Sequence, residues 1–288
     1  MTILIAAPVL SATKSSDSPT NEMCVLNLWQ IDSFEGGKGS RASYLQNVAN
    51  EFAKSASCYV TVTTLSAAAA RENLKNGIVP DLISYGAGTF GIETYIQSDI
   101  PYYTWCHGGY CILCLDENTD FANITEHNTV INEGTGNYIK ITALMCGLEG
   151  ATYDKPTGAY VNLIKGKYKY LLGTQRDIYR LKTRGVNFSV KPVIEFNDLY
   201  QNISVTASDI QQVSKADDFV NYLLRKGEKV AQIGLMVDGI KLHSDEMKAM
   251  EGLSYQYKLI APISTNFKTE IDGAISNNDL KKLKKLFN

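Results

Sequence analysis

The sequence has no run of about 18 apolar residues, which a helix needs to cross a bilayer. It also lacks an excess of positive charge, because 28 lysines and arginines stand against 30 acidic residues and the formal net charge is -2. Proteins that neutralise phosphates need a basic face, so we expect no nucleic-acid partner. The dense basic run at 281–285 lies on a helical repeat and is expected to be a solvated helix face.

Signatures of catalysis are missing as well. The chain contains no Gly-x-Ser-x-Gly elbow and no His-Glu-x-x-His pair. Its three histidines, at positions 107, 127 and 243, are scattered and predict no metal site. We therefore expect a protein that binds without chemistry and without a cofactor.

Cysteine is present at six positions, 24, 58, 106, 111, 114 and 146, without the spacing of a small disulfide scaffold. Cys24, Cys58, Cys111 and Cys114 lie in strand-like apolar runs, where a thiol acts as a small hydrophobe, so we expect core residues. Cys111 and Cys114 have redox-motif spacing but no helix start beside them to lower a thiol pKa. We expect both to be buried, reduced and on opposite faces of one strand.

The order of predicted elements indicates an α/β protein. The 288 residues suit about two domains. Strand-like runs at 25–29, 59–65 and 81–85 alternate with helical periodicity at 41–56 and 67–76, which predicts parallel pairing with right-handed crossovers. Further strands are expected near 129–131, 169–173 and 189–193, and helices at 178–182, 216–225 and 279–286. Ligands bind beyond the carboxyl ends of such strands, which singles out the loops 30–40 and 86–91.

Several of these segments resemble one known family. They are Leu26-Asn27-Leu28-Trp29-Gln30-Ile31-Asp32, the motifs Asn76-Gly77 and Pro80-Asp81-Leu82-Ile83, the run from Tyr170 to Tyr179, and Ala216-Asp217-Asp218-Phe219 with Leu223-Leu224. Together and in this order they are similar to bacterial extracellular solute-binding proteins of ABC importers, of the sugar-binding class. The resemblance covers most of 24–288, but each pattern alone is weak. It implies a type II periplasmic-binding-protein fold, with two α/β lobes joined by hinge crossovers around one ligand cleft.

The resemblance also implies a domain division and a cellular role. Lobe 1 is expected to comprise 23–105 with about 203–236, and lobe 2 to comprise 106–202 with about 237–288. The protein is expected to be an extracytoplasmic monomer that captures a small polar ligand, a carbohydrate first of all, and delivers it to a membrane permease. The chain is shorter than many sugar binders of the class, which argues against a cleft for a long oligosaccharide. No lipoprotein cysteine motif is visible near the start, so the sequence does not establish a lipid anchor.

The first residues support export. Residues 3–12 resemble a shortened apolar signal core without a basic flank, and 13–21 are rich in Ser, Thr, Asp and Pro. We expect 1–22 to be the remnant of a targeting segment, incomplete here. The alternative is an ordinary buried first strand.

Candidate ligand contacts follow from the chemistry of sugar recognition, which needs flat apolar faces beside planar polar side chains. Trp29 either lines the cleft or fills the lobe core, and Arg176 and Asp177 either face the ligand or pair with each other at the surface. We expect the two strand-end loops around Trp29 and Gln175 to meet one ligand from opposite lobes. The expected contacts are Trp29, Gln30, Asp32, Glu35, Ser40, Tyr85, Gly86, Tyr103, Trp105, Asn137, Gln175, Arg176 and Asp177.

Two alternatives to transport remain. A glycoside hydrolase would need two carboxylates flanking the scissile bond, and Asp32 with Glu133 would be the pair if facing lobes brought them together. The other alternative is a ligand-sensing module that serves no importer.

Overall fold

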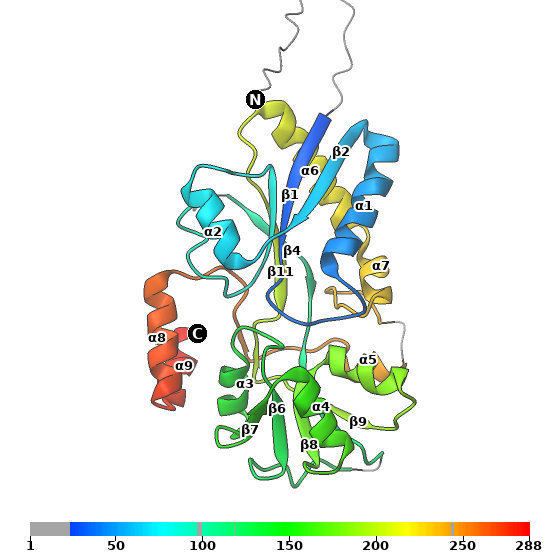
Figure 1. Ribbon diagram of the computed structural model, residues 1–288, viewed down its shortest axis with the longest axis vertical. Helices are drawn as coiled ribbons and strands as arrows, with labels where there is room; N and C mark the ends of the chain where they lie inside the picture. Colours follow the sequence, from blue (N-terminus) through cyan, green and yellow to red (C-terminus); the bar gives the residue numbers. More distant parts are fainter. Residues whose placement is uncertain (1–23, 97–99, 118, 243–244) are drawn as a thin grey trace, which may run out of the picture.

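The computed structural model describes residues 24–96, 100–117, 119–242 and 245–288. The expected leader at 1–22 and His243 lie outside these residues. The described chain forms two α/β lobes, one above the other in Figure 1, each built on a five-stranded sheet. Within the described ranges, no helix has the length and apolar character needed to cross a bilayer.

The first sheet has the strand order β2-β1-β3-β11-β4. As predicted, β1 runs parallel to both β2 and β3, and β11 then pairs antiparallel with β3 and β4. The carboxyl ends of β1 and β3 therefore lie at the same edge, which faces the other lobe. The strands are β1 (Cys24–Ile31), β2 (Cys58–Thr64), β3 (Leu82–Gly86), β4 (Tyr102–His107) and β11 (Tyr200–Val205).

Helices cover both faces of this sheet. α1 (Arg41–Ala56) begins after Ser40, whose side chain accepts a hydrogen bond from the Ser43 amide. Its predicted apolar face is buried and packs beside α6 (Ile210–Leu224), with the rings of Phe52 and Phe219 5.4 Å apart. α2 (Ala67–Lys75) covers the opposite face, and the short α7 (Gly227–Gln232) follows α6.

The second sheet has the order β7-β6-β8-β5-β9. β6 runs parallel to β7 and β8, whereas β5 is antiparallel to β8 and β9. The strands are β5 (Tyr110–Cys114), β6 (Thr129–Asn132), β7 (Thr152–Asp154), β8 (Tyr170–Thr174) and β9 (Ser189–Pro192), and the helices are α3 (Ile139–Met145), α4 (Pro156–Ile164) and α5 (Gln175–Thr183).

The chain passes between the sheets where β4 continues through Gly108 and Gly109 into β5, and again just before β11. The expected lobe boundaries at 105/106 and 202/203 fall within β4 and β11. The last helices pack against α3 of the second lobe. The remaining elements are β10 (Phe196–Asn197), which pairs with β12 (Tyr257–Lys258), the 3-10 helix η1 (Asp245–Met250), α8 (Thr265–Ser276) and α9 (Leu280–Leu286).

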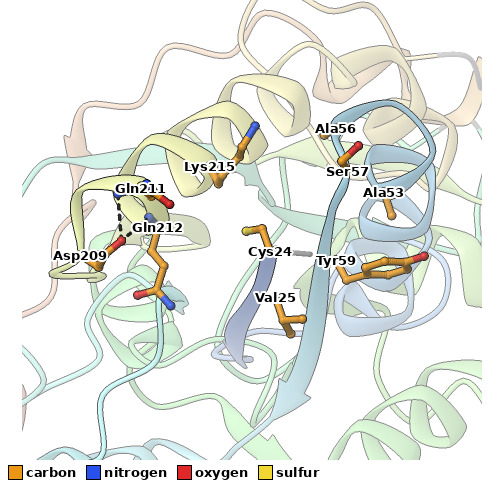
Figure 2. A pocket seen from close by; sticks show the side chains of 10 residues that line it. All are labelled: Cys24, Val25, Ala53, Ala56, Ser57, Tyr59, Asp209, Gln211, Gln212 and Lys215. Carbon is orange, nitrogen blue, oxygen red and sulfur yellow. Dashed lines mark hydrogen bonds between the residues drawn. The ribbon is translucent and has the colours of Figure 1, made fainter. Parts of the chain in front are cut away.

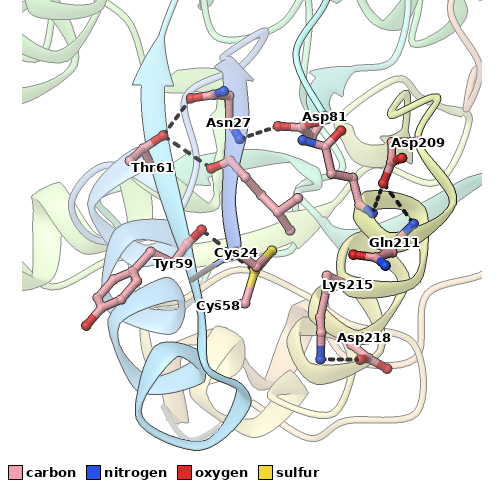
Figure 3. The surroundings of a disulfide bond; sticks show 12 residues. Cys24, Asn27, Cys58, Tyr59, Thr61, Asp81, Asp209, Gln211, Lys215 and Asp218 are labelled. Atoms are coloured by element: carbon pink, nitrogen blue, oxygen red, sulfur yellow. Dashed lines mark hydrogen bonds and ion pairs between the residues drawn. A yellow bond between two sulfur atoms is a disulfide. The ribbon is translucent and has the colours of Figure 1, made fainter. Parts of the chain in front are cut away.

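Two of the cysteines expected to be core thiols form a disulfide instead. Cys24 and Cys58 start the neighbouring strands β1 and β2 and are directly opposite in register, so their side chains meet (Figure 3). The expectation was wrong for this pair because it considered each strand alone. Cys111 and Cys114 are buried free thiols, as predicted, and they belong to two different hydrophobic clusters on either side of β5.

Candidate functional site

The two lobes meet at the loop after β1. This loop follows a strand of the first sheet, but it forms hydrogen bonds with the second lobe. The Glu35 amide donates to the carbonyl of Thr135, 3.0 Å away, and the Thr174 hydroxyl donates to the carbonyl of Glu35. The Arg176 guanidinium donates to the carbonyl of Gly37. We call residues 32–40 the bridging loop, because these contacts tie it to the other lobe.

An ion pair crosses the same interface. The Arg180 guanidinium lies 2.7 Å from the Glu35 carboxylate and 2.9 Å from that of Asp177. Asp177 is fully buried, and its carboxylate also accepts hydrogen bonds from the Thr174 amide and from Asn132. Burial raises the pKa of Asp177, while these hydrogen bonds and Arg180 oppose the rise. Asp177 is therefore a helix-capping residue of α5 that holds Arg180 toward the first lobe.

The structure places the expected aromatic contacts inside lobe 1 or on its surface. Trp29 and Tyr85 are 7% and 2% exposed and pack with residues of α2, on the face of the sheet opposite α1. Trp105 is 2% exposed and donates from its indole to the Ser84 hydroxyl. Tyr103 is 40% exposed, on β4.

The expected polar contacts lie in three places. Asp32 accepts hydrogen bonds from Gln30 and from Arg41, which neutralises the carboxylate considered for the hydrolase alternative. Ser40 caps α1, and Gly86 has no room for a side chain because Ser33 packs against it. The remaining residues, Glu35, Asn137, Gln175, Arg176 and Asp177, all lie where the lobes meet.

Four side-chain amides at the facing ends of the sheets have orientations fixed by their hydrogen-bond partners. The amide nitrogens of Gln30, Gln201 and Asn132 donate to Asp32, to the carbonyl of Ile31 and to Asp177 respectively. Since those partners can only accept, the amide oxygens point elsewhere, and they are buried without a hydrogen bond among the described residues. Gln175 is turned the other way, because its oxygen accepts from the Gly109 amide and leaves its nitrogen unpaired. The Ser33 hydroxyl is buried and unpaired as well.

A cavity of about 580 Å³ has walls from both lobes and from α8. We call it the cleft cavity. Phe90 comes from the connection after β3, Tyr138 and Glu133 come from the connection between β6 and α3, and Lys268 pairs with Asp272 on α8. The lining residues are Gly88, Phe90, Glu133, Gly134, Gly136, Asn137, Tyr138, Ile139, Lys140, Lys268, Asp272, Ile275 and Ser276.

Two residues of the cleft cavity were expected from the sequence, Asn137 as a ligand contact and Glu133 as one carboxylate of the hydrolase alternative. Asn137 donates from its amide to the carbonyl of Ala87 and so also joins the lobes. Phe90 and Tyr138 were missed, although Phe90 ends the run Gly86-Ala87-Gly88-Thr89-Phe90, which falls within a predicted ligand loop. Gly86, Gly88 and Gly91 have the Gly-x-Gly-x-x-Gly spacing of the motif that binds dinucleotides. The run leads into turns instead of a helix, so it lacks the helix N-terminus that binds pyrophosphate.

A second cavity, of about 880 Å³, lies far from the cleft at the outer end of lobe 1. Figure 2 shows Cys24 and Val25 of β1 on its floor, with Asp209, the N-cap residue of α6, and Lys215 of α6 on one side and Tyr59 on the other. It is open to solvent, and its walls come from lobe 1 alone. A ligand there would not contact both lobes, so we place the candidate site in the cleft.

Metal-binding side chains do not gather in the described part of the chain. Across 24–96, 100–117, 119–242 and 245–288, no three or more histidine, cysteine, aspartate or glutamate side chains are arranged to hold a metal ion.

No family model matches the chain, and no curated protein matches it. Solved structures do. The chain is similar to a cyclic alpha-maltosyl-1,6-maltose binding protein from Arthrobacter globiformis, with 9% identity, a TM-score of 0.60 and coverage of 92% of this chain and 98% of that one. An IdiA (FutA) protein of Trichodesmium in complex with iron and citrate matches with 10% identity, a TM-score of 0.59 and coverage of 92% and 100%.

A third similar structure is the substrate-binding domain of a molybdenum ABC transporter from Clostridium difficile, with 14% identity, a TM-score of 0.53 and coverage of 75% and 100%. The three proteins differ in what they bind, and their identities to this chain are low. What they share with it is the fold. The chain therefore has the type II periplasmic-binding-protein fold that its sequence predicts.

Proposed function

We propose that the protein is an extracytoplasmic solute-binding protein that captures a small carbohydrate between its lobes and delivers it to the permease of an ABC importer. The observation that carries the proposal is the cleft cavity, because one ligand in it would touch both lobes and α8 at once. Its volume of about 580 Å³ falls in the range of small-molecule sites. Similar structures bind ligands of several classes, so the choice of carbohydrate rests on this chain's own residues.

The cavity lining suits a sugar ring. Phe90 and Tyr138 line the cavity from opposite lobes, with the Arg71 guanidinium 4.2 Å and the Lys268 ammonium 5.4 Å from the centroid of the Phe90 ring. Their rings supply apolar surface to C–H groups, and Glu133 and Asn137 supply planar polar groups to hydroxyls. The proposed contacts are these four residues, with Lys140 and Asp272 at the cavity wall. We propose that Trp29, Tyr85 and Trp105 serve lobe 1 as packing residues instead.

The buried amides at the lobe interface favour the same ligand class. The unpaired oxygens of Gln30, Asn132 and Gln201 are free acceptors, whereas among these four amides only Gln175 has an unpaired donor. Sugar hydroxyls donate as well as accept, but an oxyanion can only accept. These amides do not line the cleft cavity, so they act on a ligand only if it extends from the cavity into the lobe interface, where hydroxyl groups would pair with both the unpaired oxygens and the unpaired nitrogen.

We propose lobes of 24–107 with 200–234 and of 108–199 with 235–288, and closure as the ligand-responsive motion. The contacts of the bridging loop exist only when the lobes are together. A ligand that touches both lobes shifts the equilibrium toward this closed form by its differential affinity. Export agrees with the Cys24–Cys58 disulfide, since such bonds persist in oxidising compartments.

The test is a thermal-shift screen followed by calorimetry, with mono- and disaccharides, molybdate and ferric citrate as the panel. We expect a sugar to stabilise the protein, because a ligand specific for the native state stabilises it by about 2.7 kcal/mol at a hundredfold excess over Kd. Stabilisation by molybdate or ferric citrate alone would refute the carbohydrate and keep the binding function. Cleavage of a bound glycoside would refute both.

Phe90→Leu supplies the site-directed test, because it keeps an apolar side chain but removes the flat ring. We expect affinity for the sugar to fall by about tenfold and Phe90→Tyr to restore it. Tyr59→Leu is the matched control. Tyr59 is a half-exposed aromatic residue lining the outer cavity. If Tyr59→Leu weakens binding and Phe90→Leu does not, the ligand site lies in the outer cavity and the cleft assignment is wrong.

A further inference from the structure

A third cavity lies beside the hinge and is separate from the cleft. It has a volume of about 310 Å³ and is lined by His107 at the end of β4, by 236–242 and by 250–253. We call it the hinge pocket. Because His107 is the last residue of β4 before the crossing to the second sheet, the pocket adjoins a segment whose backbone must change when the lobes move.

The walls of the hinge pocket are largely apolar. Met236, Leu242 and Met250 are 4%, 8% and 1% exposed, and Ile240 and Leu253 complete the lining. Methionine side chains adapt to ligands of different shape, because they are unbranched and polarizable. This lining fits a short alkyl or aryl group.

The polar end of the pocket is formed by the His107 ring and the Asp238 carboxylate, and hydrogen bonding to His107 lowers the pKa of that carboxyl. Nδ1 of His107 lies 3.1 Å from the carbonyl oxygen of Gly108, and because a carbonyl can only accept, Nδ1 carries the proton. In the neutral imidazole Nε2 is then an acceptor, and it lies 3.4 Å from a carboxylate oxygen of Asp238. A group that donates to both atoms would satisfy them together. Glu251 adds a second carboxylate to the lining, against one cation, Lys241.

The pocket is coupled to the hinge through backbone bonds. His107 and Met236 exchange both of their amide-to-carbonyl hydrogen bonds, each 2.8 Å long. The His107 ring also stacks on Tyr200 at the start of β11, with the ring centroids 5.4 Å apart. A ligand held by His107, Met236 and Asp238 would therefore clamp the β4 crossing to the segment that follows α7.

We propose that the hinge pocket is a second binding site, for a small primary amine with an apolar tail, and that its occupancy slows movement at the hinge. The ammonium group donates to His107 Nε2 and to Asp238, and the tail lies against Met236, Met250 and Leu253. The site is distinct from the carbohydrate cleft and does not depend on what the cleft binds.

Hexylammonium is the probe, with hexan-1-ol and hexanoate as ligands of matched tail length. We expect calorimetry to rank affinity as the amine first, the alcohol second and the acid last. Asp238→Asn should weaken amine binding by about fivefold, because the Asp238 carboxylate is solvent-exposed and its ion pair is screened. Asp217→Asn, an exposed carboxylate on α6, should leave binding unchanged. Equal affinity for the three probes, or no effect of Asp238→Asn, would overturn the ammonium assignment.

The location is tested by filling the pocket. Leu253→Trp should abolish amine binding, whereas Ile164→Trp, at a half-exposed position on α4, should not. Hydrogen exchange of 106–110 and 235–238 should slow when hexylammonium is bound. Unchanged exchange in the presence of bound amine would refute the coupling to the hinge, and binding that survives Leu253→Trp would refute the site.

Discussion

Reduction of the Cys24–Cys58 disulfide should cost the protein a large part of its stability. The bond joins residues 34 positions apart. For a closed loop of this length, the chain-entropy relation gives a loss of about 4 kcal/mol in the free energy of unfolding. Since domains are stable by only about 5–15 kcal/mol, the reduced protein should unfold at clearly lower urea concentration. The corresponding fall in Tm is about 10 °C.

The assay is urea unfolding of the wild type with and without reductant, beside the variant Cys24→Ala/Cys58→Ala. The variant should match the reduced wild type and should not respond to reductant. Thiol titration in denaturant provides an independent count, because the structure has four free cysteines among the six in the sequence. Six reactive thiols in protein purified without reductant, or a stability change below about 1 kcal/mol, would refute the pairing or its entropic origin.

Three further predictions concern the lobe interface, the free thiols and the buried carboxyl of Asp198, which accepts hydrogen bonds from the Tyr110 hydroxyl and the Tyr138 amide. Glu35→Gln removes the ion pair with Arg180 across the lobes and should lower the free energy of unfolding by about 0.5–1 kcal/mol, because both groups are partly exposed. It should also increase the radius of gyration measured by X-ray scattering. An unchanged radius would contradict the role of this ion pair in closure. Burial raises the pKa of Asp198 from 3.8 to about 6, so its stabilising contribution is present below pH 4 and lost as the pH rises through 6. Between pH 4 and pH 6 the free energy of unfolding of the wild type should fall by about 3 kcal/mol because of this group, and that of Asp198→Asn should not. Chemical unfolding of both proteins at the two pH values measures the difference. Cys111→Ala/Cys114→Val should keep sugar affinity unchanged in calorimetry, and a loss of affinity at unchanged stability would mean that these thiols act in binding.

Local sequence periodicity determined most of the secondary structure. The apolar positions 44, 45, 48, 49 and 52 all lie on the buried face of α1, because a helix places residues three and four apart on one side. Alternating strands and helices at 24–86 predicted parallel pairing, because short right-handed crossovers allow few arrangements, and the structure adds the order β2-β1-β3. Gln175, Arg176 and Asp177 were predicted to contact a ligand, which stays a prediction; the structure shows Arg176 bonded to the carbonyl of Gly37 in the other lobe.

The tertiary structure alone decided which helix or loop covers each face of a strand. Trp29 and Gln30 are neighbours, and the alternation of β1 sends Trp29 toward α2 and Gln30 toward Asp32 and Arg41. The sequence shows the alternation but not which helix covers which face. The same limit hid the disulfide, which depends on the register between β1 and β2 and not on either strand by itself.

The cleft cavity depends still more on three-dimensional contact. Its aromatic residues Phe90 and Tyr138 come from loops of different lobes, and α8 closes the wall from near the end of the chain. Each of these segments is unremarkable in sequence, because a loop aromatic packs or binds according to what lies opposite. Sequence patterns record the local preferences of the chain, whereas a site built across two lobes exists only once long-range packing has brought its parts together.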